Sequence, residues 1–111
     1  MHDVLVVEDD PFVAGWLLRL LASRGVLQVA CAATVVEAMK LLDPPPYWVI
    51  LDMNLPDGSG LEVLHAIRNA KLPTRVIVSS STTNDGVLAA VAAYNPELVL
   101  PKPLDPTLLP F

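Results

Sequence analysis

The chain has 111 residues, enough for one domain and too few for two independent hydrophobic cores. Hydrophobic residues make up 53% of it and the mean hydropathy is +0.51. Charged residues nevertheless interrupt every apolar run before it reaches the roughly 20 residues of a membrane-spanning helix. The net charge of −5, without a run of Lys or Arg, excludes direct binding of nucleic acid by this segment.

The first apolar run begins at Val4, without the basic segment and cleavage site of a secretory signal before it. We therefore expect a cytoplasmic domain with no membrane partner. Cys31 is the one cysteine, so no internal disulfide can form. Its neighbours, Val29, Ala30 and Ala32, are apolar, and we expect its thiol to lie in the core.

Strand-like and helix-like hydrophobic patterns alternate along the chain. Strand patterns are short runs rich in Val, Ile and Leu, whereas helix patterns are longer and amphipathic. In chain order they predict strand Val4–Val7, helix Pro11–Ser23, strand Val26–Cys31, helix Thr34–Leu42, strand Tyr47–Leu51, helix Ser59–Ala70, strand Arg75–Ser79, helix Asn84–Tyr94 and strand Leu98–Leu100.

This alternation predicts an α/β fold with a parallel sheet covered by helices on both faces. The expected type is a flavodoxin-like, doubly wound five-stranded parallel sheet with strand order 2-1-3-4-5. A ligand site in such a sheet lies at the carboxyl ends of the first and third strands. Functional residues are therefore expected just after Val7 and just after Leu51.

Carboxylates follow both of these strands. Glu8, Asp9 and Asp10 come after the first strand, and Asp52 comes after the third. Two carboxylates about 4 Å apart repel each other by roughly 4 kcal/mol at an effective dielectric constant near 20. Such a cluster favours a bound Mg²⁺, Mn²⁺ or Ca²⁺ ion. The alternative is that the three consecutive acids are solvated loop residues, but Asp52 at the switch point of the sheet favours a site.

Three segments carry a specific resemblance. They are Val4-Leu-Val-Val-Glu-Asp-Asp-Pro, Pro101-Lys-Pro and, most specifically, Leu51-Asp-Met-Asn-Leu-Pro-Asp-Gly-Ser-Gly-Leu-Glu-Val-Leu. The sequence resembles the receiver domain of bacterial two-component response regulators, over residues 3 to about 105. The resemblance implies one receiver domain over residues 1–111, with any effector domain lying outside this chain.

The resemblance implies a phosphorelay function in which Asp52 becomes an aspartyl phosphate. Asp9 would bind Mg²⁺ directly, Glu8 mainly through metal-bound water, and Asn54 through its main-chain carbonyl. Asp52 completes the metal site, and Mn²⁺ is an alternative ion. A metal and a cation would neutralise the charge that develops on the phosphoryl oxygens.

Two further residues would contact the phosphoryl group. Lys102 would pair with it, and the resemblance also implies a cis Lys102–Pro103 peptide bond. Ser80 is expected at the switch position, with Ser81 as the alternative because the alignment is uncertain by one residue. Asp10 is interpreted as a helix N-cap before Pro11.

Other residues receive structural interpretations. Pro56-Asp57-Gly58 is typical of a turn. Capping boxes are predicted at two helix starts, Thr34 with Glu37 and Ser59 with Glu62. His2 and His65 have no metal-ligand spacing and are expected on the surface.

The sequence departs from the family at three places. Val99 occupies the readout position where receivers commonly carry an aromatic residue. Asn95-Pro-Glu replaces the usual Gly-Ala-Asp before the last strand. The last helix is truncated, since Leu104–Phe111 contains two prolines and supplies at most about one helical turn. We therefore expect a homodimer through the surface of the fourth helix and fifth strand.

The partner implied by the resemblance is a sensor histidine kinase or a histidine phosphotransfer protein. It would dock on the first helix, where Phe12 or Trp16 could contact it. The chain would not be an enzyme beyond catalysing its own phosphorylation and dephosphorylation.

Three alternatives remain. A pseudo-receiver that only binds other proteins is favoured by Val99 alone. A phosphohydrolase of the haloacid dehalogenase type needs a second acid two residues after Asp52, where this chain has Asn54. A flavodoxin-like cofactor binder needs a phosphate loop where this chain has three acids.

Overall fold

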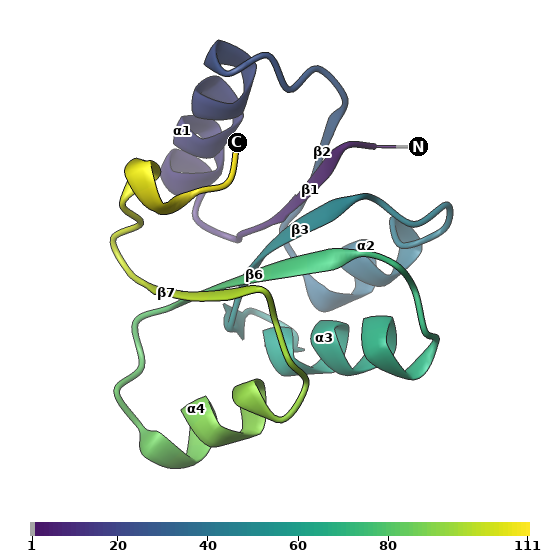
Figure 1. Ribbon diagram of the computed structural model, residues 1–111, viewed down its shortest axis with the longest axis vertical. Helices are drawn as coiled ribbons and strands as arrows, with labels where there is room; N and C mark the ends of the chain where they lie inside the picture. Colours follow the sequence, from purple (N-terminus) through teal and green to yellow (C-terminus); the bar gives the residue numbers. More distant parts are fainter. Residues whose placement is uncertain (1) are drawn as a thin grey trace.

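The computed structural model describes residues 2–111, so Met1 of the predicted domain lies outside the described residues (Figure 1). Its elements are β1 (Val4–Val7), α1 (Pro11–Ser23), β2 (Val29–Ala32), α2 (Val35–Lys40), β3 (Trp48–Asp52), β4 (Asn54–Leu55), β5 (Gly58–Ser59), α3 (Gly60–Asn69), β6 (Arg75–Ser80), α4 (Asp85–Ala92), β7 (Leu98–Pro101) and a 3₁₀ turn, η1 (Pro106–Leu108).

The main sheet has five strands in the order β2-β1-β3-β6-β7, and every pair in it is parallel. Since β4 and β5 form a separate two-stranded hairpin, this order is the predicted 2-1-3-4-5. The doubly wound, flavodoxin-like fold is therefore confirmed.

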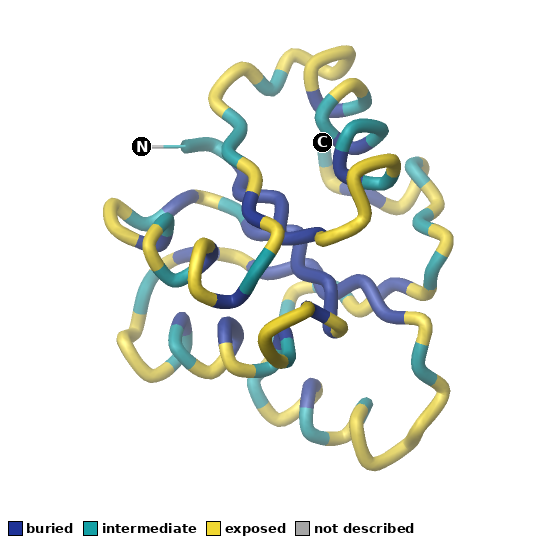
Figure 2. Tube along the Cα trace, turned by 180° about the vertical axis from the view of Figure 1, so that it is seen from behind, coloured by how far each residue is buried: buried dark blue, intermediate teal, exposed yellow. Residues whose placement is uncertain are grey.

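The central strands are buried on both faces, because their alternate side chains point into two different cores. Leu5 and Val7 of β1 pack towards α2, α3 and α4, whereas Val4 and Val6 pack towards α1. Figure 1 shows α1 on one side of the sheet and the other three helices opposite. In Figure 2 the strands form the buried centre and the outer turns of the helices are exposed.

The predicted helix starts are largely confirmed. The Asp10 carboxylate accepts from the amides of Phe12 at 2.9 Å and Val13 at 3.4 Å, which makes Asp10 the N-cap of α1. The predicted capping box at Ser59 is present at the start of α3. At α2 only half of the box forms. The Thr34 hydroxyl accepts from the amide of Glu37, but the Glu37 carboxylate accepts from the amide of Ala33 rather than from that of Thr34.

The C-terminal segment forms one 3₁₀ turn, in agreement with the predicted limit on its helical length. It lies on the same face of the sheet as α1 (Figure 1). Leu109 is 6% exposed, and the Phe111 ring meets Trp48 edge-on with 5.4 Å between ring centroids. The Arg24 guanidinium donates to the main-chain oxygen of Phe111 at 3.0 Å. This segment therefore covers part of the sheet beside α1.

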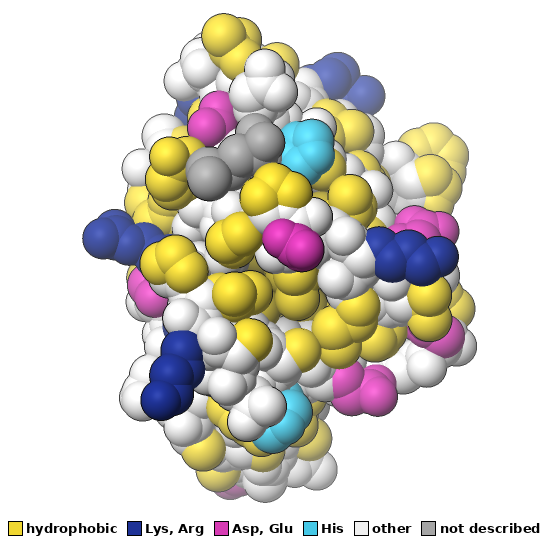
Figure 3. All heavy atoms as spheres, turned by 90° about the vertical axis from the view of Figure 1, so that its right-hand side faces the viewer, with side chains coloured by type: hydrophobic (Ala, Val, Ile, Leu, Met, Phe, Trp, Pro, Cys, Tyr) yellow, Lys and Arg dark blue, Asp and Glu magenta, His cyan; other side chains and the backbone are white. Residues whose placement is uncertain are grey.

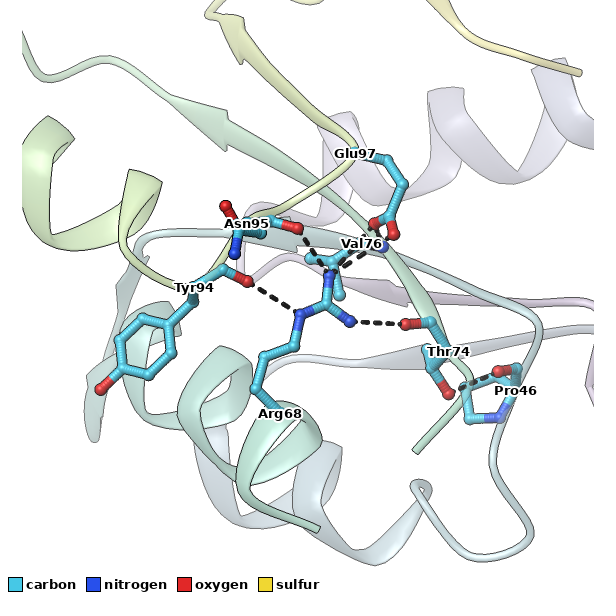
Figure 4. A network of polar contacts seen from close by, with 7 residues as sticks. All are labelled: Pro46, Arg68, Thr74, Val76, Tyr94, Asn95 and Glu97. Carbon is cyan, nitrogen blue, oxygen red and sulfur yellow. Dashed lines mark hydrogen bonds and ion pairs between the residues drawn. The ribbon is translucent and has the colours of Figure 1, made fainter. Parts of the chain in front are cut away.

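Arg68 of α3 ties the start of β6 to the loop before β7 (Figure 4). Its guanidinium donates to the main-chain oxygens of Tyr94, Thr74 and Asn95 at 2.9–3.0 Å. It also forms an ion pair with Glu97 at 3.3 Å. Asn95 stands where the Gly-Ala-Asp common in the family has its glycine. Its φ is 49°, a left-handed conformation that Asn tolerates.

Two predictions about β2 are wrong. The strand begins at Val29 rather than Val26, and Cys31 is exposed rather than in the core. β2 is an edge strand, and Ala32 is its one buried residue. Apolar neighbours in sequence therefore do not bury the Cys31 thiol. Within residues 2–111, no helix is long and apolar enough to cross a membrane.

Candidate functional site

Three predicted carboxylates converge at the carboxyl ends of β1 and β3. Glu8 directly follows β1, and Asp52 is the last residue of β3. One ligand oxygen from each of Glu8, Asp9 and Asp52 lies within 4.8 Å of the others. Glu8 and Asp52 are each 4% exposed, whereas Asp9 is exposed to solvent. The cluster is therefore open on one side.

Lys102 follows β7 and reaches two of these carboxylates. Its ammonium lies 3.0 Å from Oε2 of Glu8 and 3.2 Å from Oδ2 of Asp52. Burial lowers the pKa of Lys102, but its hydrogen bond to Glu8 and the charge of Asp52 outweigh burial and raise the pKa overall. Lys102 is therefore a cation beside the acidic cluster at neutral pH.

Burial has the opposite consequence for Glu8. It raises the pKa of Glu8 above its ordinary value, although the hydrogen bonds from Lys102 and from the amide of Asp10 act against this rise. The nearby Asp52 carboxylate raises it further. Such a carboxylate gains from a nearby cation, because a cation favours its ionised form.

The loop after Asp52 folds back on the strand that precedes it. The Asn54 amide donates to Oδ1 of Asp52 at 3.2 Å, and the Gly60 amide donates to the main-chain oxygen of Met53 at 2.9 Å. A Cβ on Gly60 would lie 2.2 Å from the main-chain oxygen of Asp52. Only glycine therefore allows α3 to begin this close to the site.

Asp57 lies in the β4–β5 turn, as the turn prediction requires, but it also has a long-range contact. Its two carboxylate oxygens accept from the amides of Val35 at 2.7 Å and Val36 at 3.1 Å, at the start of α2. These hydrogen bonds, from Val35 first, hold the pKa of Asp57 below its ordinary value. Asp57 thus anchors the loop of Asp52 to α2, a role that sequence reasoning missed.

Ser80 ends β6, opposite Pro101 of β7, and is 5% exposed. Its hydroxyl accepts from the amide of Thr82 at 3.1 Å, and its carbonyl accepts from the Lys102 amide at 3.0 Å. Ser81, the alternative, is exposed. The Lys102–Pro103 bond is cis, as the resemblance implied.

Val99 lies apart from the carboxylates, on the surface of β7, and is 42% exposed. It shares a cavity of about 230 Å³ with Ser80, Thr82, Leu88, Leu100 and Pro101. The readout position therefore does not belong to the acidic cluster, but a continuous cavity joins it to Ser80.

The other predicted candidates lie elsewhere. Asp10 caps α1, and the exposed His65 contacts the Tyr94 hydroxyl at 2.9 Å rather than a ligand cluster. Figure 3 faces the right-hand side of Figure 1. On that face, acidic and basic side chains are interspersed among apolar ones, without a large patch of one charge.

The donor set fits a hard divalent cation. Carboxylate oxygens from the loop after β1 and from the end of β3 converge on one side of the sheet edge, and Mg²⁺ and Mn²⁺ prefer oxygen ligands of this kind. A carboxylate, a group of possible metal ligands and a lysine lie side by side here, and these are the parts needed to accept a phosphoryl group on an aspartate.

Comparison with known proteins identifies the family of the chain. The sequence model of the response regulator receiver domain matches residues 4–110. The chain is 34% identical over 103 residues to the acid tolerance regulatory protein ActR of Rhizobium meliloti, covering 92% of this chain and 53% of that protein. It therefore spans about half the length of this curated relative.

Solved structures show the same fold. The signal receiver domain of a DNA-binding response regulator from Colwellia psychrerythraea matches with a TM-score of 0.86 and 26% identity, covering 97% of this chain and 91% of that one. A CheY-like receiver domain protein from Methanospirillum hungatei matches in fold, with a TM-score of 0.87, 20% identity and coverage of 96% and 86%. The chain belongs to the response regulator receiver domain family, whose members act in two-component phosphorelay signalling.

Proposed function

We propose that Asp52 accepts a phosphoryl group in a Mg²⁺-dependent reaction and that this modification changes a protein-binding surface. The observation that carries the proposal is the position of the Lys102 ammonium, 3.2 Å from Asp52 and 3.0 Å from Glu8. This position places a positive charge beside the carboxylate that would receive the phosphoryl group, where the charge can pair with the phosphoryl oxygens.

The metal would be held by Glu8, Asp9, Asp52 and the main-chain carbonyl of Asn54, with Mn²⁺ as a substitute for Mg²⁺. The chemistry that the ion supplies when bound is neutralisation of charge on the phosphoryl oxygens. The convergence of three carboxylates supports this ligand set, since their mutual repulsion is relieved by a divalent cation.

The transfer itself needs one nucleophile and no base. An oxygen of Asp52 forms a bond to phosphorus while the bond from phosphorus to the donor nitrogen breaks, and the electron pair of that bond stays on the donor imidazole. Lys102 compensates the charge of the new phosphoryl oxygens at the point where it now pairs with Asp52. The Asn54 amide, 3.2 Å from Oδ1, holds the carboxylate in one orientation.

We assign the switch to Ser80 and the readout to the surface around Val99. Rotation of the Ser80 hydroxyl towards a phosphoryl oxygen would break its bond with the Thr82 amide, which precedes α4. The cavity that Ser80 shares with Val99 leaves room for this movement. The rearrangement would therefore reach the α4–β7 surface without an aromatic side chain at residue 99.

The partner on the input side would be a sensor histidine kinase or a histidine phosphotransfer protein, in the cytoplasm. Phe12 supports docking on α1, because it is 86% exposed and lies two residues after the N-cap Asp10 beside the acidic cluster. On the output side, the α4–β7 surface would form a homodimer. Val87 is 38% exposed and Val99 is 42% exposed there.

The deciding experiment is intact-mass spectrometry and NMR after incubation with acetyl phosphate or BeF₃⁻ and Mg²⁺. We expect one adduct in the wild type and none in Asp52→Asn. Asp57→Asn is the matched control, since it removes a carboxylate from the same loop but should keep the adduct. A wild type without an adduct would favour a pseudo-receiver, and repeated turnover of phosphate esters would favour a phosphohydrolase. Either result overturns the proposal.

A further inference from the structure

A second cavity lies on the α1 side of the sheet, and the acidic cluster does not line it. Its volume is about 180 Å³, and its walls come from α1, the end of β6 and the segment after β7: Val13, Trp16, Ser79, Lys102, Pro103 and Leu104. The Lys102 ammonium is bound to Glu8 and Asp52, so its alkyl stem is the part left to line the cavity. The walls are therefore mainly apolar.

Ser79 is the exception among these walls. It is 2% exposed, and within residues 2–111 its hydroxyl has no hydrogen-bond partner. Its neighbour Ser80 points to the other face of the strand and accepts from Thr82. Ile77, two residues before Ser79 on β6, belongs to the core beneath α1. Since alternate residues of a strand point to the same face, Ser79 also faces α1. A buried hydroxyl without a partner is costly, which makes an unfilled hydrogen bond here a signal for a ligand.

The size of the cavity limits what could supply that bond. An apolar cavity of about 150 Å³ is large enough to bind benzene, whereas a buried water needs two to four polar partners. Ser79 is the one hydroxyl among the lining residues, and the Trp16 indole is the one other uncharged polar group. A molecule of the size of one six-membered ring matches these walls better than a water molecule does.

We propose that this cavity binds a small, uncharged and mostly apolar molecule whose single hydroxyl or carbonyl group hydrogen-bonds to the Ser79 hydroxyl. An anion is disfavoured, because the one cation at the wall is already paired with two carboxylates. The cavity shares Lys102 with the place where a phosphoryl group would bind, but Glu8, Asp9 and Asp52 do not line it. It does not depend on phosphorylation or on a metal.

Phenol and benzene are the probes, added to the 111-residue chain without Mg²⁺ or a phosphate donor. Binding is followed through the amide resonance of Ser79 and the indole resonance of Trp16. We expect saturable binding of both probes, with phenol the tighter. Ser79→Ala should weaken phenol about fivefold, the effect of one neutral hydrogen bond, and leave benzene unchanged.

Ser81→Ala is the matched control, since Ser81 is exposed and does not line the cavity. It should change the affinity of neither probe. The proposal is overturned if phenol produces no saturable shifts at Trp16, or if phenol binds wild type and Ser79→Ala equally well. Failure here would leave the adduct at Asp52 unaffected, and failure to form that adduct would leave phenol binding unaffected.

Discussion

The Lys102 ammonium lies 3.2 Å from Oδ2 of Asp52, although Asp52 ends β3, Lys102 follows β7, and these two strands do not pair with each other. β6 separates β3 from β7, and its last residue, Ser80, accepts from the Lys102 amide. The lysine therefore crosses one strand to reach the phosphoacceptor candidate. It can do so because parallel strands end at the same edge of the sheet.

Lys102→Ala should make the chain less stable in the presence of a chelator. The variant leaves the buried carboxylates of Glu8 and Asp52 without their cation, and we expect a loss of about 2 kcal/mol in the free energy of unfolding. Excess Mg²⁺ should stabilise the variant more than the wild type, since the ion no longer competes with an ammonium group. Urea unfolding with and without Mg²⁺ measures both effects.

Lys40→Ala provides the control for this measurement. Lys40 is exposed at the end of α2, so its removal should change stability by no more than a few tenths of a kcal/mol, with the same response to Mg²⁺ as the wild type. A Lys102→Ala variant as stable as the wild type in chelator would contradict the pairing that we derive from the site.

Ser80→Ala should separate phosphorylation from its readout. The adduct at Asp52 should still form, because Ser80 is not the nucleophile, but the shifts of Leu88 and Val99 on adding BeF₃⁻ should shrink. Ser81→Ala makes the same change at the neighbouring exposed serine and should respond as the wild type does. If Ser81→Ala reduces the NMR shifts of Leu88 and Val99 and Ser80→Ala does not, the switch lies at Ser81.

Much of the fold could be predicted from local patterns. The bounds of α1 match the predicted Pro11–Ser23, because Asp10 and Pro11 mark its start and Gly25, with a φ of 81°, follows its end. Strand order follows from the alternation of strands and helices, and it places Glu8 and Asp52 at one edge. The roles of Lys102 and Ser80 came from the family resemblance, since a single lysine or serine has no distinguishing pattern.

What could not be predicted depends on contacts distant in sequence. Asp57 caps α2 from 22 residues away, and Pro-Asp-Gly signals a turn without indicating that partner. The exposure of Cys31 depends on β2 lying at the edge of the sheet. The β4–β5 hairpin has strands of two residues each, too short for any period to appear in the sequence.

Arg68→Lys should test the network that holds the loop before β7 (Figure 4). Lysine keeps the charge, but a single ammonium cannot reach the carbonyls of Thr74, Tyr94 and Asn95 in the planar arrangement of a guanidinium. We expect a loss of about 2 kcal/mol in urea unfolding. Arg19→Lys on the exposed side of α1 is the control and should be neutral. Equal stability of the Arg68 variant and the wild type would show that charge alone suffices.

The α4–β7 surface should form the proposed homodimer. In a concentration series by light scattering, the mass should rise from 11.9 kDa towards twice that value. Val99→Glu should keep the chain monomeric, because it introduces a charge into the proposed interface. Leu27→Glu is the control, since Leu27 follows α1 and is 82% exposed; this variant should dimerise as the wild type does. A wild type that remains monomeric at high protein concentration would refute the dimer.

Asp57→Asn should lower stability in a pH-dependent manner. Hydrogen bonds from the amides of Val35 and Val36 hold the folded-state pKa of Asp57 below its ordinary value of 3.8. The stability that these bonds give to the ionised form is therefore fully present above the unfolded-state pKa and is lost as the pH falls through the lower folded-state pKa. Urea midpoints of the variant and the wild type should differ at about pH 7 and converge at about pH 2.

Asp85→Asn is the charge-matched control for this last prediction. Asp85 is also exposed and lies in the first turn of α4, but its carboxylate accepts no hydrogen bond from residues 2–111. Asp85→Asn should therefore change the urea midpoint less than Asp57→Asn does at about pH 7. If the urea midpoints of Asp57→Asn and the wild type differed by the same amount at every pH, the loss of stability would come from the altered shape of the side chain and not from its charge. The ionised carboxylate would then not be what joins the loop of Asp52 to α2.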